Sequence, residues 1–166
     1  MIDSSGHTYL IALGSNMRSH RHGHPRNVLA RAAEMIALTG IEVAVVSKAI
    51  TSKPIGPSSR EYANAVAVLR CALKPPALLI VLQDIERKFG RERRGQRWRE
   101  RVLDLDIVLW SGGVFRTRNL TIPHPEFRHR DFVLGPATAI AGHWRDPESG
   151  LSLRQLAARL AKQSKG

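Results

Sequence analysis

Two aspartates, Asp104 and Asp106, lie in the segment RWRERVLDLDIVLW at 97–110, which otherwise has the aliphatic pattern of a buried strand. Side chains alternate between the faces of a strand, so both carboxylates are predicted to share one face, with Cα atoms roughly 7 Å apart. The opposite face would carry Leu103, Leu105, Ile107 and Leu109. Like charges beside a low-dielectric sheet repel each other and lose hydration, so they require a positive partner. Two Mg²⁺ ions, which lie about 3.5–4 Å apart in two-metal sites, could be that partner; the alternative is a pair of aspartates on a solvent-facing side of the sheet.

Arginine is concentrated directly before this strand, in a segment GRERRGQRW that glycines interrupt; its arginines are Arg91, Arg93, Arg94 and Arg97. Mg²⁺ is usually shared between a few carboxylates and substrate phosphates, and cationic side chains neutralise the charge that develops in phosphoryl transfer. The combination predicts phosphoryl transfer, and the absence of a GxxxxGK[ST] motif excludes a P-loop enzyme.

The hydrophobic pattern predicts the elements that must position these residues. Strands are expected at 9–16, ending in a Gly-Ser-Asn turn, and at 41–50, 62–73 and 102–110; helices are expected at 25–38 and 75–90. The order β-α-β-β-α-β predicts an α+β ferredoxin-like sandwich, an antiparallel sheet with two helices on one face. The C-terminal third adds short strands, an apolar run at 132–142 and a helix near 151–162, which form a C-terminal extension.

Length and composition limit the possible classes of protein. The 166 residues fit one domain, 1–166. The formal charge of +12 suits an anionic partner: nucleic acid, membrane or a phosphorylated small molecule. No apolar run reaches the ~18 residues of a membrane span, and the N-terminal segment lacks the pattern of a secretory signal. One cysteine, Cys71, excludes a disulfide framework, suits a reducing cytoplasm and is expected to be a buried thiol.

Several polar residues have two interpretations from the sequence alone. Asn64 lies among small apolar strand residues, so its side-chain amide forms hydrogen bonds either with the backbone or with a ligand. Gln83 and Glu86 share a helix face, which is usually an ordinary polar face. His124 stands between two prolines, whose stiffness could position its ring at a phosphate. His20, His22 and His24 alternate in a loop, a weak signal for zinc, so a solvated loop is preferred.

Four segments together, ALGSN, YANAVA, GRERRGQRWRERVLDLDIVL and LTIPHPEFRHRDFVL, resemble the 6-hydroxymethyl-7,8-dihydropterin pyrophosphokinase family of folate biosynthesis. The likeness runs from about Tyr9 to Ile140, and R-W-x-x-R-x-L-D-L-D-I followed by I-P-H-P and R-x-F-V-L carries it. The resemblance implies a ferredoxin-like fold and transfer of pyrophosphate from ATP to the pterin hydroxymethyl group, with release of AMP. It also implies two Mg²⁺ ions on Asp104 and Asp106. With these substrates, we expect the loop from Gly90 to Arg99 to be mobile without ligands and to order when ATP, Mg²⁺ and the pterin are all bound, because its five arginines repel each other until an anion is present.

The resemblance assigns further residues. Catalytic roles fall, beside the two aspartates, to Arg93, Arg97 and Arg101. Nucleotide contacts would be Gln83, Glu86, Arg91, Ile107, Thr121, His124 and Arg130. The pterin pocket would comprise Ser52, Ile55, Tyr62, Asn64, Trp98 and Phe132, with the two aromatics stacking on the ring. Trp110 has no such support and is expected in the core. The chain departs from the family at Ser52 and Lys53, where threonine and proline are common, at Asn119, and in the basic, histidine-rich segment 17–27.

Three other functions compete with this interpretation. An RNA-binding module shares the element order but would need aromatics on exposed central strands, where this chain has only terminal tyrosines. A nucleotidyl transferase or cyclase could use the same two-metal carboxylates, and Asn64, Trp98 and Phe132 argue against it. A scaffold would leave the aspartate pair beside an arginine loop unexplained. We therefore expect a cytoplasmic enzyme, a monomer, with small-molecule substrates and neither nucleic acid nor membrane as partner.

Overall fold

The computed structural model describes residues 6–17, 23–52, 61–90 and 102–165. Its main sheet has β1 (His7–Met17) at the centre, between β4 (Glu61–Cys71) and β5 (Asp104–Trp110). On its other side β4 pairs with β2 (Glu42–Val46) and β3 (Ile50–Ser52), and every pairing is antiparallel. The order β2-β4-β1-β5 is the order of a ferredoxin-like sandwich, so the predicted fold class is confirmed.

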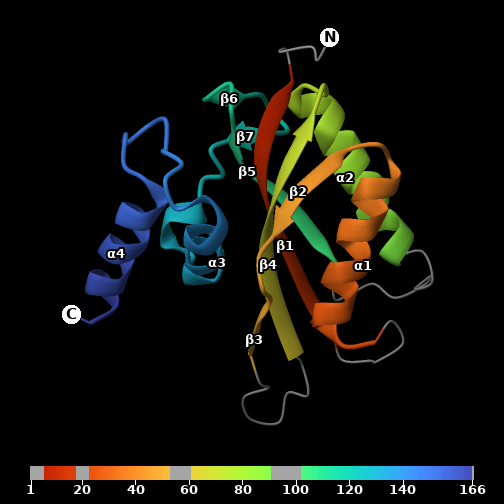
Figure 1. The fold of residues 1–166 in the computed structure, drawn as a ribbon, viewed down its shortest axis with the longest axis horizontal. Helices are drawn as coiled ribbons and strands as arrows, with labels where there is room; N and C mark the ends of the chain where they lie inside the picture. The colour runs from red at the N-terminus through yellow and green to blue at the C-terminus, as the bar shows by residue number, and fades with distance from the viewer. Residues whose placement is uncertain (1–5, 18–22, 53–60, 91–101, 166) are drawn as a thin grey trace.

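Helices cover both faces of this sheet (Figure 1). On one face lie α1 (Pro25–Leu38) and α2 (Pro75–Gly90), with the bounds that the sequence predicts. On the other face lies α3 (Asp131–Ala141), and α4 (Leu153–Ser164) packs against the outer side of α3; together they form the C-terminal extension. Between β5 and α3 the chain forms a hairpin of β6 (Phe115–Arg116) and β7 (Thr121–Ile122), then a 3₁₀ turn η1 (Phe127–His129). No described helix has the length and apolar character needed to span a bilayer.

The two layers of helices create two hydrophobic cores. Alternation along β1 sends Tyr9, Ile11 and Leu13 toward α1 and α2, whereas Leu10 packs with Phe127 of η1 on the α3 side. All five side chains are at most 1% exposed. The C-terminal extension is therefore packed onto the sheet and not appended to it.

A β-bulge corrects one prediction about β5. Leu10 lies opposite Leu109 and Ile11 opposite Ile107, so Val108 is an extra residue in the pairing with β1. A bulge interrupts strict alternation, and Val108 and Leu109 both pack in the core on the α3 side. The expectation that Leu109 shares a face with Ile107 is wrong for this reason.

Other departures are local. The predicted Gly-Ser-Asn turn is wrong, because Gly14, Ser15 and Asn16 remain in β1 and pair with β4. The predicted strand at 41–50 is interrupted after Val46, where the Ser47 hydroxyl accepts a hydrogen bond from the Val66 amide at 2.9 Å. Cys71 and Trp110 are only partly buried at the margin of the core.

A capping box begins α4. The Ser152 hydroxyl accepts a hydrogen bond from the Gln155 amide, and the Gln155 side chain accepts one from the Ser152 amide. We expect Ser152→Ala to lower the free energy of unfolding by about 1 kcal/mol, because amides of the first turn lose their acceptor. Urea denaturation measures this, and Ser164→Ala, at the C-terminal end of the same helix, is the control. Equal losses in both variants would contradict the capping assignment.

Candidate active site

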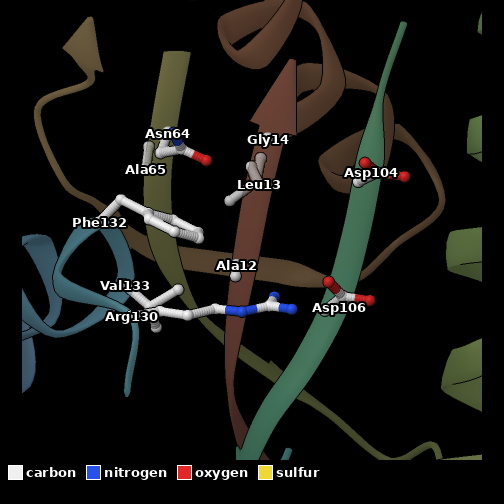
Figure 2. Close-up of a pocket in the computed structure, with 10 residues that line it drawn as sticks. All are labelled: Ala12, Leu13, Gly14, Asn64, Ala65, Asp104, Asp106, Arg130, Phe132 and Val133. Atoms are coloured by element: carbon white, nitrogen blue, oxygen red, sulfur yellow. The ribbon is translucent and has the colours of Figure 1, made fainter. Parts of the chain in front are cut away.

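A cavity of about 250 Å³ opens on the α3 side of the sheet, where β1, β4 and β5 meet the start of α3. Figure 2 shows its lining: Ala12, Leu13, Gly14, Asn64, Ala65, Asp104, Asp106, Arg130, Phe132 and Val133. Five of these are residues for which the sequence predicts a role: Asn64, Asp104, Asp106, Arg130 and Phe132. Residues separated by 68 positions along the chain therefore line one cavity.

Small residues on β1 leave the floor of the cavity open. Gly14 lies opposite Asn64 of β4 on one side and opposite Asp104 of β5 on the other, and Ala12 lies opposite Asp106. A Cβ at Gly14 would be 3.2 Å from Oδ1 of Asn64, which is tighter than an ordinary contact. Neither Gly14 nor Ala12 is among the predicted site residues, although the small residues of ALGSN inside an aliphatic strand could have indicated them.

Two hydrogen bonds fix the start of β5, which carries the aspartates. The buried Ser15 hydroxyl donates to the Val102 carbonyl oxygen at 2.6 Å. Oε2 of Glu86 on α2 accepts a hydrogen bond from the Leu105 amide at 2.9 Å. Backbone on both sides of Asp104 is thus held by side chains from neighbouring elements.

His124 approaches the aspartate pair from the loop after β7. Its amide donates to the Val108 carbonyl oxygen at 3.0 Å, and its Nδ1 accepts from the Glu126 amide at 3.1 Å. Burial lowers the pKa of the imidazole by more than the nearby Asp106 carboxylate raises it. A neutral ring that accepts at Nδ1 carries its proton on Nε2, and that nitrogen is 4.0 Å from Oδ2 of Asp106.

Arg130 brings positive charge into the cavity. Figure 2 shows its side chain extending across β1 toward Asp106. Its guanidinium carbon lies 5.7 Å from the ring centre of Phe132, a cation–π contact. Phe132 is 38% exposed and lines the same cavity as Asn64.

The other predicted site residues lie elsewhere or outside the described residues. Gln83 is exposed on α2, Ile107 is buried in the core below α1 and α2, Thr121 is half-buried on β7, and Tyr62 is exposed near the start of β4. Ser52 ends β3, where its backbone pairs with that of Tyr62. Outside the described residues lie Ile55, Arg91, Arg93, Arg97, Trp98 and Arg101, and with them residues 91–99 of the loop predicted to order with the substrates. Two of the zinc candidates, His20 and His22, also lie outside the described residues.

Solved structures with this fold include a two-part enzyme. The Plasmodium falciparum HPPK-DHPS wild type with pterin and p-hydroxybenzoate superposes with a TM-score of 0.69 over 99% of this chain and 45% of that one, at 11% identity. Another structure of the wild type gives a TM-score of 0.71 over 96% of this chain and 42% of the other. At this identity the likeness defines the class of fold, that of the HPPK part of these proteins.

Sequence comparison goes further. The model of the 7,8-dihydro-6-hydroxymethylpterin-pyrophosphokinase family matches residues 10–142. A 2-amino-4-hydroxy-6-hydroxymethyldihydropteridine pyrophosphokinase of Synechocystis is 42% identical over 130 residues, which are 78% of this chain and 66% of the relative. The Haemophilus influenzae protein of the same name is 39% identical over 158 residues, 94% of this chain and 92% of the relative. The chain belongs to this family, and the sequence-based recognition of an ATP-dependent diphosphotransferase of folate biosynthesis is confirmed.

Proposed function

We propose that the protein transfers pyrophosphate from ATP to 6-hydroxymethyl-7,8-dihydropterin and releases AMP, and that the cavity described above is where this occurs. The observation that carries the proposal is the convergence of an amide, an aromatic ring, two carboxylates and an arginine on one cavity. A concave site with a few convergent polar groups that fix the orientation of the ligand is the usual form of a small-molecule site.

The end of the cavity near Asn64 and Phe132 suits the pterin. The Asn64 carboxamide offers both a donor and an acceptor, which match the adjacent acceptor and donor groups of the pterin ring. Phe132 offers a flat apolar surface for stacking. Gly14 has no side chain to crowd the Asn64 carboxamide, whose Oδ1 would lie 3.2 Å from an added Cβ.

The carboxylate end suits Mg²⁺ and phosphates. Asp104 and Asp106 are oxygen donors that border the cavity, and the Asp106 side chain is 46% exposed. Mg²⁺ takes oxygen ligands, commonly one or two carboxylates together with waters and substrate phosphates, so the donor set fits, and we propose that it holds two ions. Bound Mg²⁺ would neutralise phosphate charge and align the β-phosphate for displacement.

The protein's own residues orient the two substrates. The pterin hydroxymethyl oxygen attacks the β-phosphorus, the bond from that phosphorus to the α–β bridging oxygen breaks, and AMP leaves with the electron pair while the hydroxyl proton is released. Asn64 and Phe132 hold the ring so that its hydroxymethyl group faces the aspartates. Arg130, and His124 through its Nε2 proton, are the described groups that can bind phosphate oxygens near them. Confining both reactants in one geometry supplies much of the acceleration in such a transfer.

The helices on both faces of the sheet favour a small-molecule site over an RNA-binding surface. Helices pack on both faces of the described sheet, whereas stacking of RNA bases needs an open face with aromatics. We propose further that the enzyme acts as a monomer in the cytoplasm.

A direct assay tests the reaction. Protein, Mg²⁺, ATP and 6-hydroxymethyl-7,8-dihydropterin should yield AMP and the pterin diphosphate in equal amounts. Release of ADP would mean transfer of one phosphoryl group, and absence of any nucleotide product would contradict the proposal.

Gly14→Ala tests the geometry of the pterin end. The new methyl group would lie 3.2 Å from Oδ1 of Asn64, so the carboxamide must shift by a few tenths of an ångström, which misaligns its hydrogen bonds to the ring. We expect the pterin Kd to rise about tenfold, equivalent to one weakened hydrogen bond, with ATP affinity unchanged. Calorimetric titration measures both, and Gly6→Ala, where an added Cβ meets nothing within 4 Å, is the control. A larger effect on ATP than on pterin would contradict the assignment.

A further inference from the structure

A group of four charged side chains lies behind the segment that carries His124 and Arg130. Arg128 of η1 donates from Nε and Nη2 to the two carboxylate oxygens of Asp146, at 2.7 and 2.8 Å. The Glu148 carboxylate forms two ion pairs, with Nη2 of Arg128 at 3.4 Å and with Nη2 of Arg116, on β6, at 3.0 Å. We call Arg116, Arg128, Asp146 and Glu148 the C-terminal brace.

Asp146 is the buried centre of the brace. It is 0% exposed, and besides Arg128 it accepts hydrogen bonds from the Ser149 hydroxyl at 2.7 Å and the Glu148 amide at 3.0 Å. Burial alone would raise the pKa of this carboxyl, but the hydrogen bonds from Arg128 and Ser149 outweigh it and hold the pKa at about 2. Asp146 is therefore a charged anchor throughout the neutral range.

The brace reaches the site through a short, internally bonded segment. The Phe127 amide donates to the His124 carbonyl oxygen and the Arg130 amide to the Phe127 carbonyl oxygen, both at 3.3 Å. Arg130 is the N-cap residue of α3, and its carbonyl oxygen accepts hydrogen bonds from the Val133 and Leu134 amides. Arg128 lies within this segment, and its guanidinium also covers the buried Phe127 ring at 4.7 Å.

On the other side, Arg116 ties the brace to the hairpin. Arg116 pairs with Thr121 across β6 and β7. Thr121, His124 and Arg130 are three of the nucleotide contacts that the sequence predicts, and the elements that carry them are fixed to the turn at 146–150 by one set of charges.

We propose that the C-terminal brace is a positioning element for the nucleotide subsite: the Arg128–Asp146 pair sets the placement of His124 and Arg130 beside the aspartates. The inference rests on the proposed function and assigns to the turn after α3 a part in ATP binding, although none of its residues lines the cavity. A bidentate arginine–carboxylate pair fixes direction as well as distance, and displacement of a binding group by about 1 Å can cost up to 10²-fold in rate.

Removing one partner alone would leave a buried charge unpaired and threaten the fold. The decisive variant is therefore the double replacement Arg128→Met/Asp146→Leu, since apolar side chains commonly replace a buried ion pair without loss of stability. Leucine at 146 also removes the acceptor of the Ser149 hydroxyl and the Glu148 amide, so we expect this variant to fold and to melt somewhat below the wild type. It should bind a non-hydrolysable ATP analogue with Mg²⁺ about tenfold more weakly, and bind the pterin as the wild type does. Arg128→Lys keeps the charge but not the bidentate geometry. Its affinity for the ATP analogue should lie between those of the wild type and the double variant.

Arg70→Gln/Glu42→Gln, which removes an exposed ion pair of 3.8 Å between β4 and β2, is the control for loss of a charge pair. A folded double variant with wild-type affinity for the ATP analogue would overturn the inference, as would equal losses for ATP analogue and pterin, which indicate general loosening. If the double variant does not fold, the same comparison is made with Arg128→Lys alone: weaker binding of the ATP analogue with unchanged pterin binding supports the inference, and unchanged binding of both overturns it. Failure of the wild-type protein to bind either ligand would instead contradict the proposed function, so the two failures are distinct.

Discussion

Asp104→Asn and Asp106→Asn should each lower kcat by about three orders of magnitude while the protein stays folded. Each change removes a negative oxygen donor from the pair that faces the cavity. Bound metal contributes several kcal/mol of transition-state charge stabilisation, and each 1.36 kcal/mol is tenfold in rate. The fold should survive because Asp106 is 46% exposed at its side chain, and asparagine keeps the shape of aspartate.

The measurement is AMP release at saturating ATP and pterin across a range of Mg²⁺ concentrations, with circular dichroism to verify folding. Glu42→Gln is the matched control, because it neutralises an exposed carboxylate on β2 at the far edge of the sheet. Chelation of Mg²⁺ from the wild-type reaction should abolish AMP release as well. Near-normal turnover in both aspartate variants at modest Mg²⁺ would remove the basis for a two-carboxylate metal site.

The second large effect is expected at Asn64. Truncation in Asn64→Ala leaves pterin ring donors and acceptors unpaired in a partly closed cavity, at a cost of ~1–3 kcal/mol for each unpaired group. The pterin Kd should therefore rise by roughly ten- to a hundredfold, while the Kd of an ATP analogue with Mg²⁺ changes little.

Calorimetric titration with each ligand separates the two effects. Asn119→Ala is the control, because Asn119 is an exposed amide in the loop between β6 and β7. Equal weakening of ATP and pterin binding would show that Asn64 does not belong to the pterin end. Gly14→Ala should change affinity in the same direction as Asn64→Ala, by a smaller factor, because it moves the amide without removing it.

Local patterns in the sequence were sufficient for the helices and the order of elements. Pro25, the apolar residues at helical spacing and Gly40, with its φ of +97°, give α1 the bounds that the sequence predicts. The same holds for α2, which runs from Pro75 to Gly90. Helix signals of this kind depend on neighbours within a few residues, so they can be read without knowledge of the fold.

Predictions failed where pairing between distant strands decided the outcome. Gly14, Ser15 and Asn16 look like a turn in isolation, but β4 supplies backbone partners for all three, and Ser15 bonds to Val102. Leu109 changed face because the pairing of β5 with β1 contains a bulge, which no alternation within β5 reveals.

The sequence by itself determined the family, the ferredoxin-like order of elements and the residue types that the proposed chemistry needs, because these follow from motifs and local periodicity. Only the tertiary structure decided which of the candidate residues share a cavity: Asn64, Asp104, Asp106, Arg130 and Phe132 do, whereas the Ile107 side chain lies in the core and Glu86 bonds to the Leu105 amide. The tertiary structure also decided the pairing of Arg128 with Asp146. These residues are 18 positions apart, no sequence motif connects them, and they form an ion pair only because the turn after α3 packs against η1. The reason is physical: a site of this kind depends on strand register and on the packing of separate elements, and both are set by contacts between residues far apart in the chain.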